Sequence, residues 1–282
     1  MEVLRTVEAM RAWRRARGGR LAAVPTMGAL HAGHARLMEV GKKHADGVVV
    51  SIFVNPTQFG PNEDFQKYPR DEAGDLRVCE GVGVEAVYMP GVREMYAADA
   101  SVFVDEGRLS AGLCGGRRPG HFRGVCTVVL KLMNAMGAEV FLFGEKDWQQ
   151  LAVIRRMVRD LDVGVEVTGV PIVREADGLA MSSRNRYLSR EERGAALGLS
   201  RALKRGAELV RGKTGDVATV RAAMRGVMEE HGLRVDYAEV VDGATLEAQE
   251  VVKVGSRALV AAFCGGTRLI DNSGLLEGTE WI

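Results

Sequence analysis

Short apolar runs alternate with helix-like stretches over the first 170 residues of this 282-residue chain. The runs are rich in valine, isoleucine and phenylalanine, as buried strands are, and turn formers or charged residues bound each of them. We expect strands at 21–26, 47–54, 84–90, 138–144 and 165–171, and helices at 35–45, 71–81, 123–136 and 148–161. This alternation predicts βαβ units, and therefore an α/β fold with a doubly wound parallel sheet.

The pattern changes between residues 171 and 180. Beyond that point, Ser189 and Glu192 stand at capping-box spacing, and we expect one long helix to run from there to residue 211. A second helix and three strands follow, at 216–230, 234–242, 257–264 and 267–272. Helices followed by strands predict a second, smaller α+β domain. We therefore expect two domains, residues 1–172 and 173–282.

The composition limits which binding partners and which cellular compartment we expect for this protein. Hydrophobic residues make up 46% of the chain, which is enough for a sizeable core, and the net charge is only +1. This charge balance gives no support to nucleic-acid or membrane-surface binding. The four cysteines are widely spaced without a Cys-x-x-Cys pair, and the N-terminus has no apolar signal core. We expect a cytoplasmic protein with reduced thiols, no nucleic-acid partner and no membrane partner.

Two of the five histidines, His31 and His34, stand where an expected strand gives way to a helix, in the segment PTMGALHAGH (25–34). With this spacing at a helix start, both imidazoles lie on nearly one face. A helix N-terminus offers unpaired N–H groups and positive dipole charge, which suit a phosphate. Gly28 permits a tight turn, and Gly33 allows a ligand to approach the backbone. Taken alone, the segment fits a phosphate site and a simple capped helix equally well.

Three further polar segments favour the phosphate interpretation. Asn55 and Gln58 directly follow the most apolar expected strand, at the edge where a parallel sheet binds ligands. Lys146 follows the strand at 138–144 and can act as a point charge for phosphate. The loop at 182–184 offers two hydroxyls and a guanidinium together. Each segment alone is also an ordinary turn or surface loop, so the prediction rests on their combination.

Six stretches together resemble the pantothenate synthetase (pantoate–β-alanine ligase) family: PTMGALHAGH, SIFVNPTQFGPNEDFQKYPR, FRGVCTVVLKL, FGEKDWQQL, VREADGLAMSSRNRYL and TRLIDN. They occur in order through nearly the whole chain. The His-x-Gly-His motif alone is shared with nucleotidyltransferases and class I aminoacyl-tRNA synthetases, whereas the six stretches together are specific. Trp148 stands where the family pattern has tyrosine, and Ala32 occupies a variable position. Neither departure removes a polar group of the expected site.

The resemblance implies a fold, a reaction and partners. A Rossmann-like domain is expected to bind ATP and pantoate, and the smaller C-terminal domain is expected to act as a lid. The carboxylate of pantoate attacks the α-phosphate of ATP, giving pantoyl adenylate and pyrophosphate. The amine of β-alanine then captures the acyl group and releases pantothenate and AMP. The resemblance further implies Mg²⁺ as a cofactor and a homodimer, and it assigns no metal ligands.

The resemblance also assigns site residues, with His34 as the proton donor. The expected catalytic residues are His31, His34, Lys146, Ser182, Ser183 and Arg184. The expected ATP-binding residues are Met27, Gly28, Ala29, Leu30, His31, Ala32, Gly33, His34, Gly144, Glu145, Lys146, Asp147, Val173, Met181, Ser182, Ser183 and Arg184. The expected pantoate-binding residues are Gln58 and Gln150, and Asn55, Arg118 and His121 are weaker substrate-binding candidates near the same cavity.

Other functions stay open at this point. A nucleotidyltransferase that acts on a phosphate ester would share the two histidines but would not need the paired glutamines. A class I aminoacyl-tRNA synthetase fragment is less favoured, because the charge balance shows no footprint for tRNA. A nucleotide-binding regulator without catalytic activity is an alternative from a different class.

Overall fold

The computed structural model describes residues 1–61 and 63–276, and the chain divides into two compact units. Unit 1 contains Met1–Glu145 and Gln149–Pro171, whereas unit 2 contains Lys146–Trp148 and the chain from Ile172 onward. Residues 277–282 of the expected C-terminal domain lie outside the described residues. The short segment Lys146–Trp148 therefore packs with residues that follow it by more than twenty positions in the chain.

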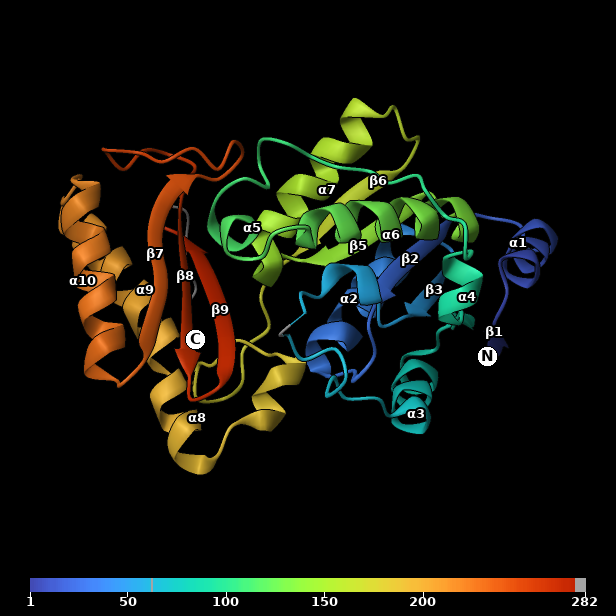
Figure 1. The fold of residues 1–282 in the computed structure, drawn as a ribbon, viewed down its shortest axis with the longest axis horizontal. Helices are drawn as coiled ribbons and strands as arrows, with labels where there is room; N and C mark the ends of the chain where they lie inside the picture. The colour runs from blue at the N-terminus through green and yellow to red at the C-terminus, as the bar shows by residue number, and fades with distance from the viewer. Residues whose placement is uncertain (62, 277–282) are drawn as a thin grey trace. The chain divides into compact units, whose positions relative to one another are not determined.

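Unit 1 is built on a six-stranded sheet in which every neighbouring pair is parallel (Figure 1). The strand order is β1-β4-β3-β2-β5-β6. The strands are β1 (Glu2–Leu4), β2 (Leu21–Thr26), β3 (Gly47–Ile52), β4 (Ala86–Tyr88), β5 (Val140–Gly144) and β6 (Glu166–Val170). This sheet confirms the predicted doubly wound α/β fold. The sequence pattern missed β1, because a strand of three residues is too short to show alternation.

Helices connect these strands and cover the sheet of unit 1 (Figure 1). Alternate residues of β2, β3 and β5, among them Val24, Val50 and Leu142, form one buried cluster with Leu37 and Met38 of α2. A spacing of two residues along each strand places these side chains on the same face of the sheet. The helical elements of this part of the chain are α1 (Val7–Ala16), α2 (Ala32–His44), η1 (Pro56–Gln58), α3 (Glu72–Val82), α4 (Val92–Met95), α5 (Leu113–Arg117), α6 (His121–Met136), η2 (Glu145–Asp147) and α7 (Trp148–Asp160).

The strand order determines where the loops of unit 1 meet. β2 lies between β3 and β5, although β5 follows β3 in the chain by almost ninety residues. All three strands run in the same direction, so the loops that leave their carboxyl ends emerge at one edge of the sheet. In open α/β sheets, ligands bind in the crevice at such a point, where the strand order reverses. The segments after β2, β3 and β5 are those that the sequence analysis selected.

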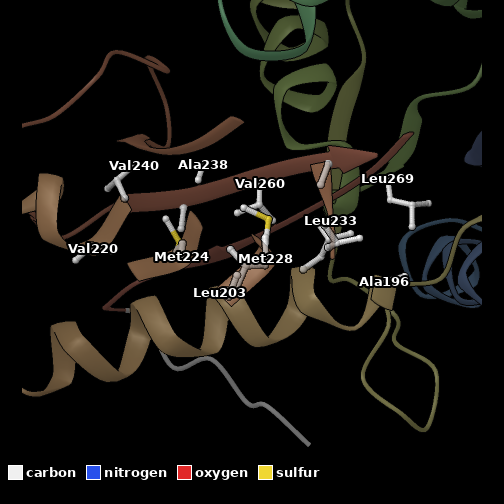
Figure 2. Packing of buried hydrophobic residues seen from close by; sticks show 14 of the residues in the cluster. Ala196, Leu203, Val220, Met224, Met228, Leu233, Ala238, Val240, Val260 and Leu269 are labelled. Carbon is white, nitrogen blue, oxygen red and sulfur yellow. The ribbon is translucent and has the colours of Figure 1, made fainter. Parts of the chain in front are cut away.

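Unit 2 contains an antiparallel sheet of order β7-β8-β9, with β7 (Arg234–Asp242), β8 (Ser256–Cys264) and β9 (Thr267–Gly274). Its helical elements are η3 (Ser183–Tyr187), α8 (Arg190–Ala196), α9 (Gly198–Arg211) and α10 (Val217–Glu230). Figure 2 shows the core of this unit, in which Leu203 of α9 and Met224 and Met228 of α10 pack with Val240 and Val260 of the sheet. This arrangement agrees with the predicted α+β character.

The single long helix predicted over 189–211 is wrong, because the chain turns at Leu197 between α8 and α9. The capping box of Ser189 and Glu192 is present and begins α8 as predicted. At the break, a Cβ atom on Gly198 would lie 2.8 Å from the Cβ of His231. The chain can therefore approach His231 this closely only with glycine at the start of α9. A helix-period pattern does not reveal such a contact, because it depends on a residue more than thirty positions away.

The core of unit 2 yields a test of stability. Leu203 is fully buried in this cluster, so Leu203→Ala removes apolar contacts and leaves a cavity. We expect the substitution to lower the free energy of unfolding by about 2–5 kcal/mol. Denaturant titration followed by circular dichroism measures this change. Lys204→Ala, at an exposed position of the same helix, is the matched control and is expected to change it by less than about 0.5 kcal/mol. Equal effects of the two substitutions would contradict the packing described here.

Candidate active site

A tight loop connects β2 to α2 and carries the first expected nucleotide segment. Gly28 (φ +81°) and Ala29 (φ +50°) both adopt left-handed backbone conformations, which turn the chain sharply after the strand. The buried carboxylate of Asp75, on α3, accepts hydrogen bonds from the N–H groups of Ala29 (2.9 Å) and Leu30 (2.7 Å). The carboxylate thereby satisfies two buried backbone donors that lie outside any helix or strand.

His31 and His34 form a capping box at the start of α2. Nδ1 of His31 accepts a hydrogen bond from the N–H of Gly33 (3.1 Å), and Nδ1 of His34 accepts one from the N–H of His31 (3.3 Å). The ring centroids lie 4.1 Å apart. Because Nδ1 is the acceptor in each neutral ring, Nε2 carries the hydrogen and is the nitrogen that can donate. Capping the helix and donating to a phosphate are therefore compatible roles for the same two side chains.

Asn55 follows β3 and caps the short helix that contains Gln58, and hydrogen bonds hold its carboxamide in one orientation. Its Oδ1 accepts hydrogen bonds from the hydroxyls of Thr57 (2.9 Å) and Tyr96 (2.8 Å). Its Nδ2 donates to Oε1 of Gln58 (3.1 Å) and to the carbonyl of Gly124 (3.2 Å). Because Asn55 is only 1% exposed, it is placed to orient Gln58 rather than to contact a ligand itself.

The orientation of Asn55 determines which end of the Gln58 carboxamide faces outward. Oε1 of Gln58 is held by Asn55, and Nε2 of Gln58 donates to the sulfur of Met27 at 3.0 Å. Burial raises the pKa of Tyr96, and its hydrogen bonds to Thr57 and Asn55 offset only part of that effect. The phenol therefore keeps its proton at neutral pH and donates to Asn55. Through this relay, Gln58 offers an N–H donor beside Met27.

Arg118, His121 and Glu63 hold the backbone of the same segment. The Gln58 carbonyl is 2.8 Å from Nδ1 of His121 and 3.3 Å from Nη2 of Arg118. Nη1 of Arg118 lies 2.9 Å from Nε2 of His121, so a neutral His121 accepts there and donates through Nδ1. Arg118 also forms a two-point ion pair with Glu63. Burial alone raises the pKa of Glu63, but the hydrogen bonds and charge of Arg118 outweigh it and lower the pKa overall.

Two adjacent glutamines at the start of α7 have different environments. Gln149 is 4% exposed, and its carboxamide binds the N–H of Cys114 and the carbonyls of Leu109 and Gly112. It therefore holds a loop of unit 1 in place. Gln150, the residue expected to bind pantoate, is only partly buried. The structure thus separates an amide that supports the fold from one that is accessible.

Within unit 2, the expected adenine and phosphate segments are joined by their backbones. The N–H of Met181 donates to the carbonyl of Val173 at 2.9 Å, and Ser182 caps the short helix that contains Ser183 and Arg184. Arg174 forms a two-point ion pair with Asp271 of β9, at 2.7 and 3.0 Å. The side chain of Asp271 is 1% exposed. The ion pair therefore fixes the base of this loop to the sheet.

Asn272, the residue after Asp271 in β9, holds the segment that contains Lys146. Nδ2 of Asn272 donates to the carbonyl of Lys146 at 2.9 Å, and the Asn272 oxygen accepts from Nε of Arg257. The guanidinium of Arg257 lies 3.4 Å from the ring centroid of Trp148, whose indole N–H donates to the carbonyl of Gly243. The expected nucleotide segments around Lys146 and Arg184 are thus anchored to adjacent residues of β9. The TRLIDN motif, which contains both residues, did not by itself predict this anchoring role.

No sequence motif indicated four residues that hold the expected site segments through polar contacts: Asp75, Tyr96, Glu63 and Arg257. Asp75 lies on α3, whose exposed and buried positions alternate as in an ordinary surface helix. Its sequence gives no indication of a special role beyond an aspartate on the buried face of the helix. Tyr96 and Glu63 lie in irregular segments, where periodicity gives no information. Only the fold shows that these side chains reach the loops at the carboxyl ends of the strands.

Residues 1–61 and 63–276 contain no group of three or more His, Cys, Asp or Glu side chains that could hold a metal ion. In the same residues, every helix is too short or too polar to span a lipid bilayer. The family-implied Mg²⁺ therefore does not fit a cage made by these side chains alone.

Comparison with known proteins places the chain among characterised families. The family model described as "Pantoate-beta-alanine ligase" matches residues 2–274. The pantothenate synthetase of Myxococcus xanthus is 53% identical over 276 residues, covering 96% of this chain and 94% of the relative. That of Clostridium novyi is 53% identical over 250 residues, covering 88% of each chain.

Solved structures give the same result. The pantothenate synthetase of Thermus thermophilus superposes with a TM-score of 0.93 at 45% identity, covering 98% of this chain and 99% of the other. The pantoate-beta-alanine ligase of Francisella tularensis, complexed with beta-gamma ATP and beta-alanine, superposes with a TM-score of 0.83 at 29% identity, covering 99% of each. On the extent of these matches and the agreement of fold, the chain belongs to the pantoate–β-alanine ligase family.

Proposed function

We propose that the chain condenses pantoate with β-alanine at the expense of ATP, through pantoyl adenylate, and releases pantothenate, AMP and pyrophosphate. One observation carries this proposal: Nε2 of Gln58 lies 3.0 Å from the sulfur of Met27. The side chain expected to bind pantoate therefore adjoins the first residue of the expected ATP segment. A carboxylate held by Gln58 is in this way brought next to a nucleotide held at the start of α2.

The first half-reaction places negative charge on the α-phosphate and on the departing pyrophosphate. In our proposal, the Nε2–H groups of His31 and His34 and the N-terminus of α2 donate to this charge as it develops. Their capping hydrogen bonds hold both rings in place before the substrate binds. Lys146 and the loop at 182–184 supply further cationic and hydroxyl donors to the triphosphate. His34 is proposed as the proton donor.

We assign pantoate recognition to two glutamines, the buried Gln58 and the partly buried Gln150. A carboxamide can both donate and accept, so Gln58 and Gln150 suit a substrate that carries hydroxyls and a carboxylate. Asn55 acts through Gln58, because its own donors and acceptor are engaged by Gln58, Gly124, Thr57 and Tyr96. Arg118 and His121 act in the same indirect way through the Gln58 backbone.

The remaining assignments concern domains, metal and assembly. We propose residues 1–172 as the nucleotide- and pantoate-binding domain and residues 173–282 as a lid, since residues from both are expected on one triphosphate. Closure would exclude water from the acyl adenylate, which hydrolyses when it is exposed. Mg²⁺ is proposed to arrive with ATP, held by phosphate oxygens and water. We also propose that the protein is a homodimer and that it is located in the cytoplasm.

Pantoate-dependent exchange of labelled pyrophosphate into ATP tests the proposed function. Reversal of the adenylation step returns label to ATP only when pantoate is present, and β-alanine is not required. We expect exchange with pantoate and, when β-alanine is added, formation of AMP that requires both substrates. The amount of label in ATP, measured with and without pantoate, shows whether the exchange depends on pantoate.

Two control reactions separate the alternatives. A nucleotidyltransferase that uses a phosphate ester would exchange with glycerol 3-phosphate or pantetheine phosphate and would ignore pantoate. A non-catalytic nucleotide-binding regulator would bind ATP without any exchange. Either result would refute the proposed function.

Asn55→Asp tests the amide relay. The substitution keeps the shape of the side chain but places an oxygen opposite Oε1 of Gln58, so the Gln58 carboxamide is expected to turn over. Pantoate then meets an oxygen instead of an N–H donor. A lost hydrogen bond to a charged group contributes about 1.5–3 kcal/mol, so the KM for pantoate should rise about 10–100-fold. The KM for ATP, measured in the same exchange assay, should change less than about threefold.

Tyr96→Phe is the matched control for this relay. It removes one of the donors to Oδ1 of Asn55 and leaves the Thr57 donors in place, so the orientation of Asn55 persists. We expect a smaller rise in the KM for pantoate than Asn55→Asp causes. A parallel rise in the KM values for pantoate and ATP in Asn55→Asp would show general disruption and would contradict the relay.

A further inference from the structure

We propose that Asp75 is a positioning residue that sets the catalytic geometry of His31 and His34 through the loop between β2 and α2. The inference rests on the proposed function, because it concerns the adenylation step. Asp75 lies on α3, more than forty residues from either histidine in the chain. None of the six stretches that resemble the family assigns it a role.

The contacts of Asp75 with the loop are direct and use both carboxylate oxygens. Oδ2 accepts from the N–H of Ala29 at 2.9 Å, and Oδ1 accepts from the N–H of Leu30 at 2.7 Å. Asp75 is 3% exposed, whereas Ala29 and Leu30 are 0% and 4% exposed. Water therefore cannot replace the carboxylate at these two donors without opening the core. Hydrogen bonds to a charged acceptor are about twice as strong as neutral ones.

The loop needs an external partner because of its backbone conformation. Gly28 and Ala29 adopt left-handed φ angles of +81° and +50° in succession. This region is disfavoured for any residue with a Cβ, so Ala29 is held there by its surroundings. A Cβ atom on Gly28 would come within 2.7 Å of Oδ2 of Asp75. The carboxylate and the turn are therefore fitted to each other, and the turn admits only glycine at position 28.

The loop leads directly into the histidine pair. Leu30, bonded to Asp75, is followed by His31, the N-cap residue of α2. The N–H of His31 in turn donates to Nδ1 of His34. A shift of the Ala29–Leu30 backbone therefore moves the N-cap residue and the hydrogen bond that fixes the second ring. Misplacement of a catalytic group by about 1 Å can cost about 10²-fold in rate.

Asp75→Asn separates this role from general support of the fold. Asparagine has nearly the same shape but only one acceptor oxygen, so its NH₂ group would face one of the two loop N–H donors. The matched control is Asp71→Asn at the N-cap of the same helix, where the side chain accepts a hydrogen bond from the N–H of Gly74. An asparagine at position 71 can still accept that bond and cap α3.

Three measurements are made on each full-length variant. Pantoate-dependent pyrophosphate exchange gives kcat and the KM for pantoate, normalised to the folded fraction from denaturant titration. Hydrogen exchange reports the protection of the Ala29 and Leu30 amides. For Asp75→Asn we expect kcat to fall about 10–100-fold, the KM for pantoate to stay within about twofold, and at least one loop amide to lose protection. For Asp71→Asn we expect wild-type kcat, KM and protection.

Other outcomes would overturn the proposal. Wild-type kcat in folded Asp75→Asn would show that the two hydrogen bonds do not set the geometry of the histidines. Failure of Asp75→Asn and of the smaller Asp75→Ser to fold would show that Asp75 supports unit 1 as a whole. If the wild-type protein shows no pantoate-dependent exchange, the proposed function fails instead. In that case, the hydrogen-exchange protection of the Ala29 and Leu30 amides is compared between the wild type and Asp75→Asn. A loss of protection in the variant would still show that Asp75 holds the turn.

Discussion

The rest of the site depends on the position of β2 between β3 and β5 in a parallel sheet. Because the three strands point the same way, each loop at their carboxyl ends emerges at one edge, although the loops are far apart in sequence. The turn after β2 begins α2 with His31, and the turn after β3 carries Asn55 and Gln58. The contact between Gln58 and Met27 is the direct result of this convergence.

Several segments that face a substrate in our proposal are held by buried polar partners that do not face one. The carboxylate of Asp75 holds the loop before His31, and Asn55 with Tyr96 orients the carboxamide of Gln58. In unit 2, Asp271 and Asn272 hold the segments that contain Arg174 and Lys146. Buried polar groups of this kind are costly unless every donor and acceptor is paired. Their pairing is therefore what makes the loops rigid enough to position catalytic groups.

The sequence predicted the sheet well because buried parallel strands produce long apolar runs that need no distant information. The expected strand at 21–26 coincides with β2, and the expected strand at 47–54 contains β3 (Gly47–Ile52). The break at Leu197 could not be predicted because it depends on a contact with the distant His231, and β1 was missed because three residues are too few to show alternation. Because such contacts join positions that are far apart in the chain, the motifs predicted His31, Gln58 and Lys146 as site residues but did not indicate the side chains that hold their loops. The sequence alone leaves a capped helix and a phosphate site as alternatives, whereas the His31–His34 capping box is compatible with both.

We propose that this ligase joins the carboxylate of pantoate to the α-phosphate of ATP at the start of α2. Pantoate labelled with ¹⁸O in both carboxylate oxygens tests it directly, with mass spectrometry of the products after reaction with ATP and β-alanine. Attack on the α-phosphate transfers one labelled oxygen to AMP and leaves the other in the amide carbonyl of pantothenate, and this is the result we predict. Label in inorganic phosphate, or AMP without label, would contradict the account, because the carboxylate would then have been activated at a different phosphorus or not at all.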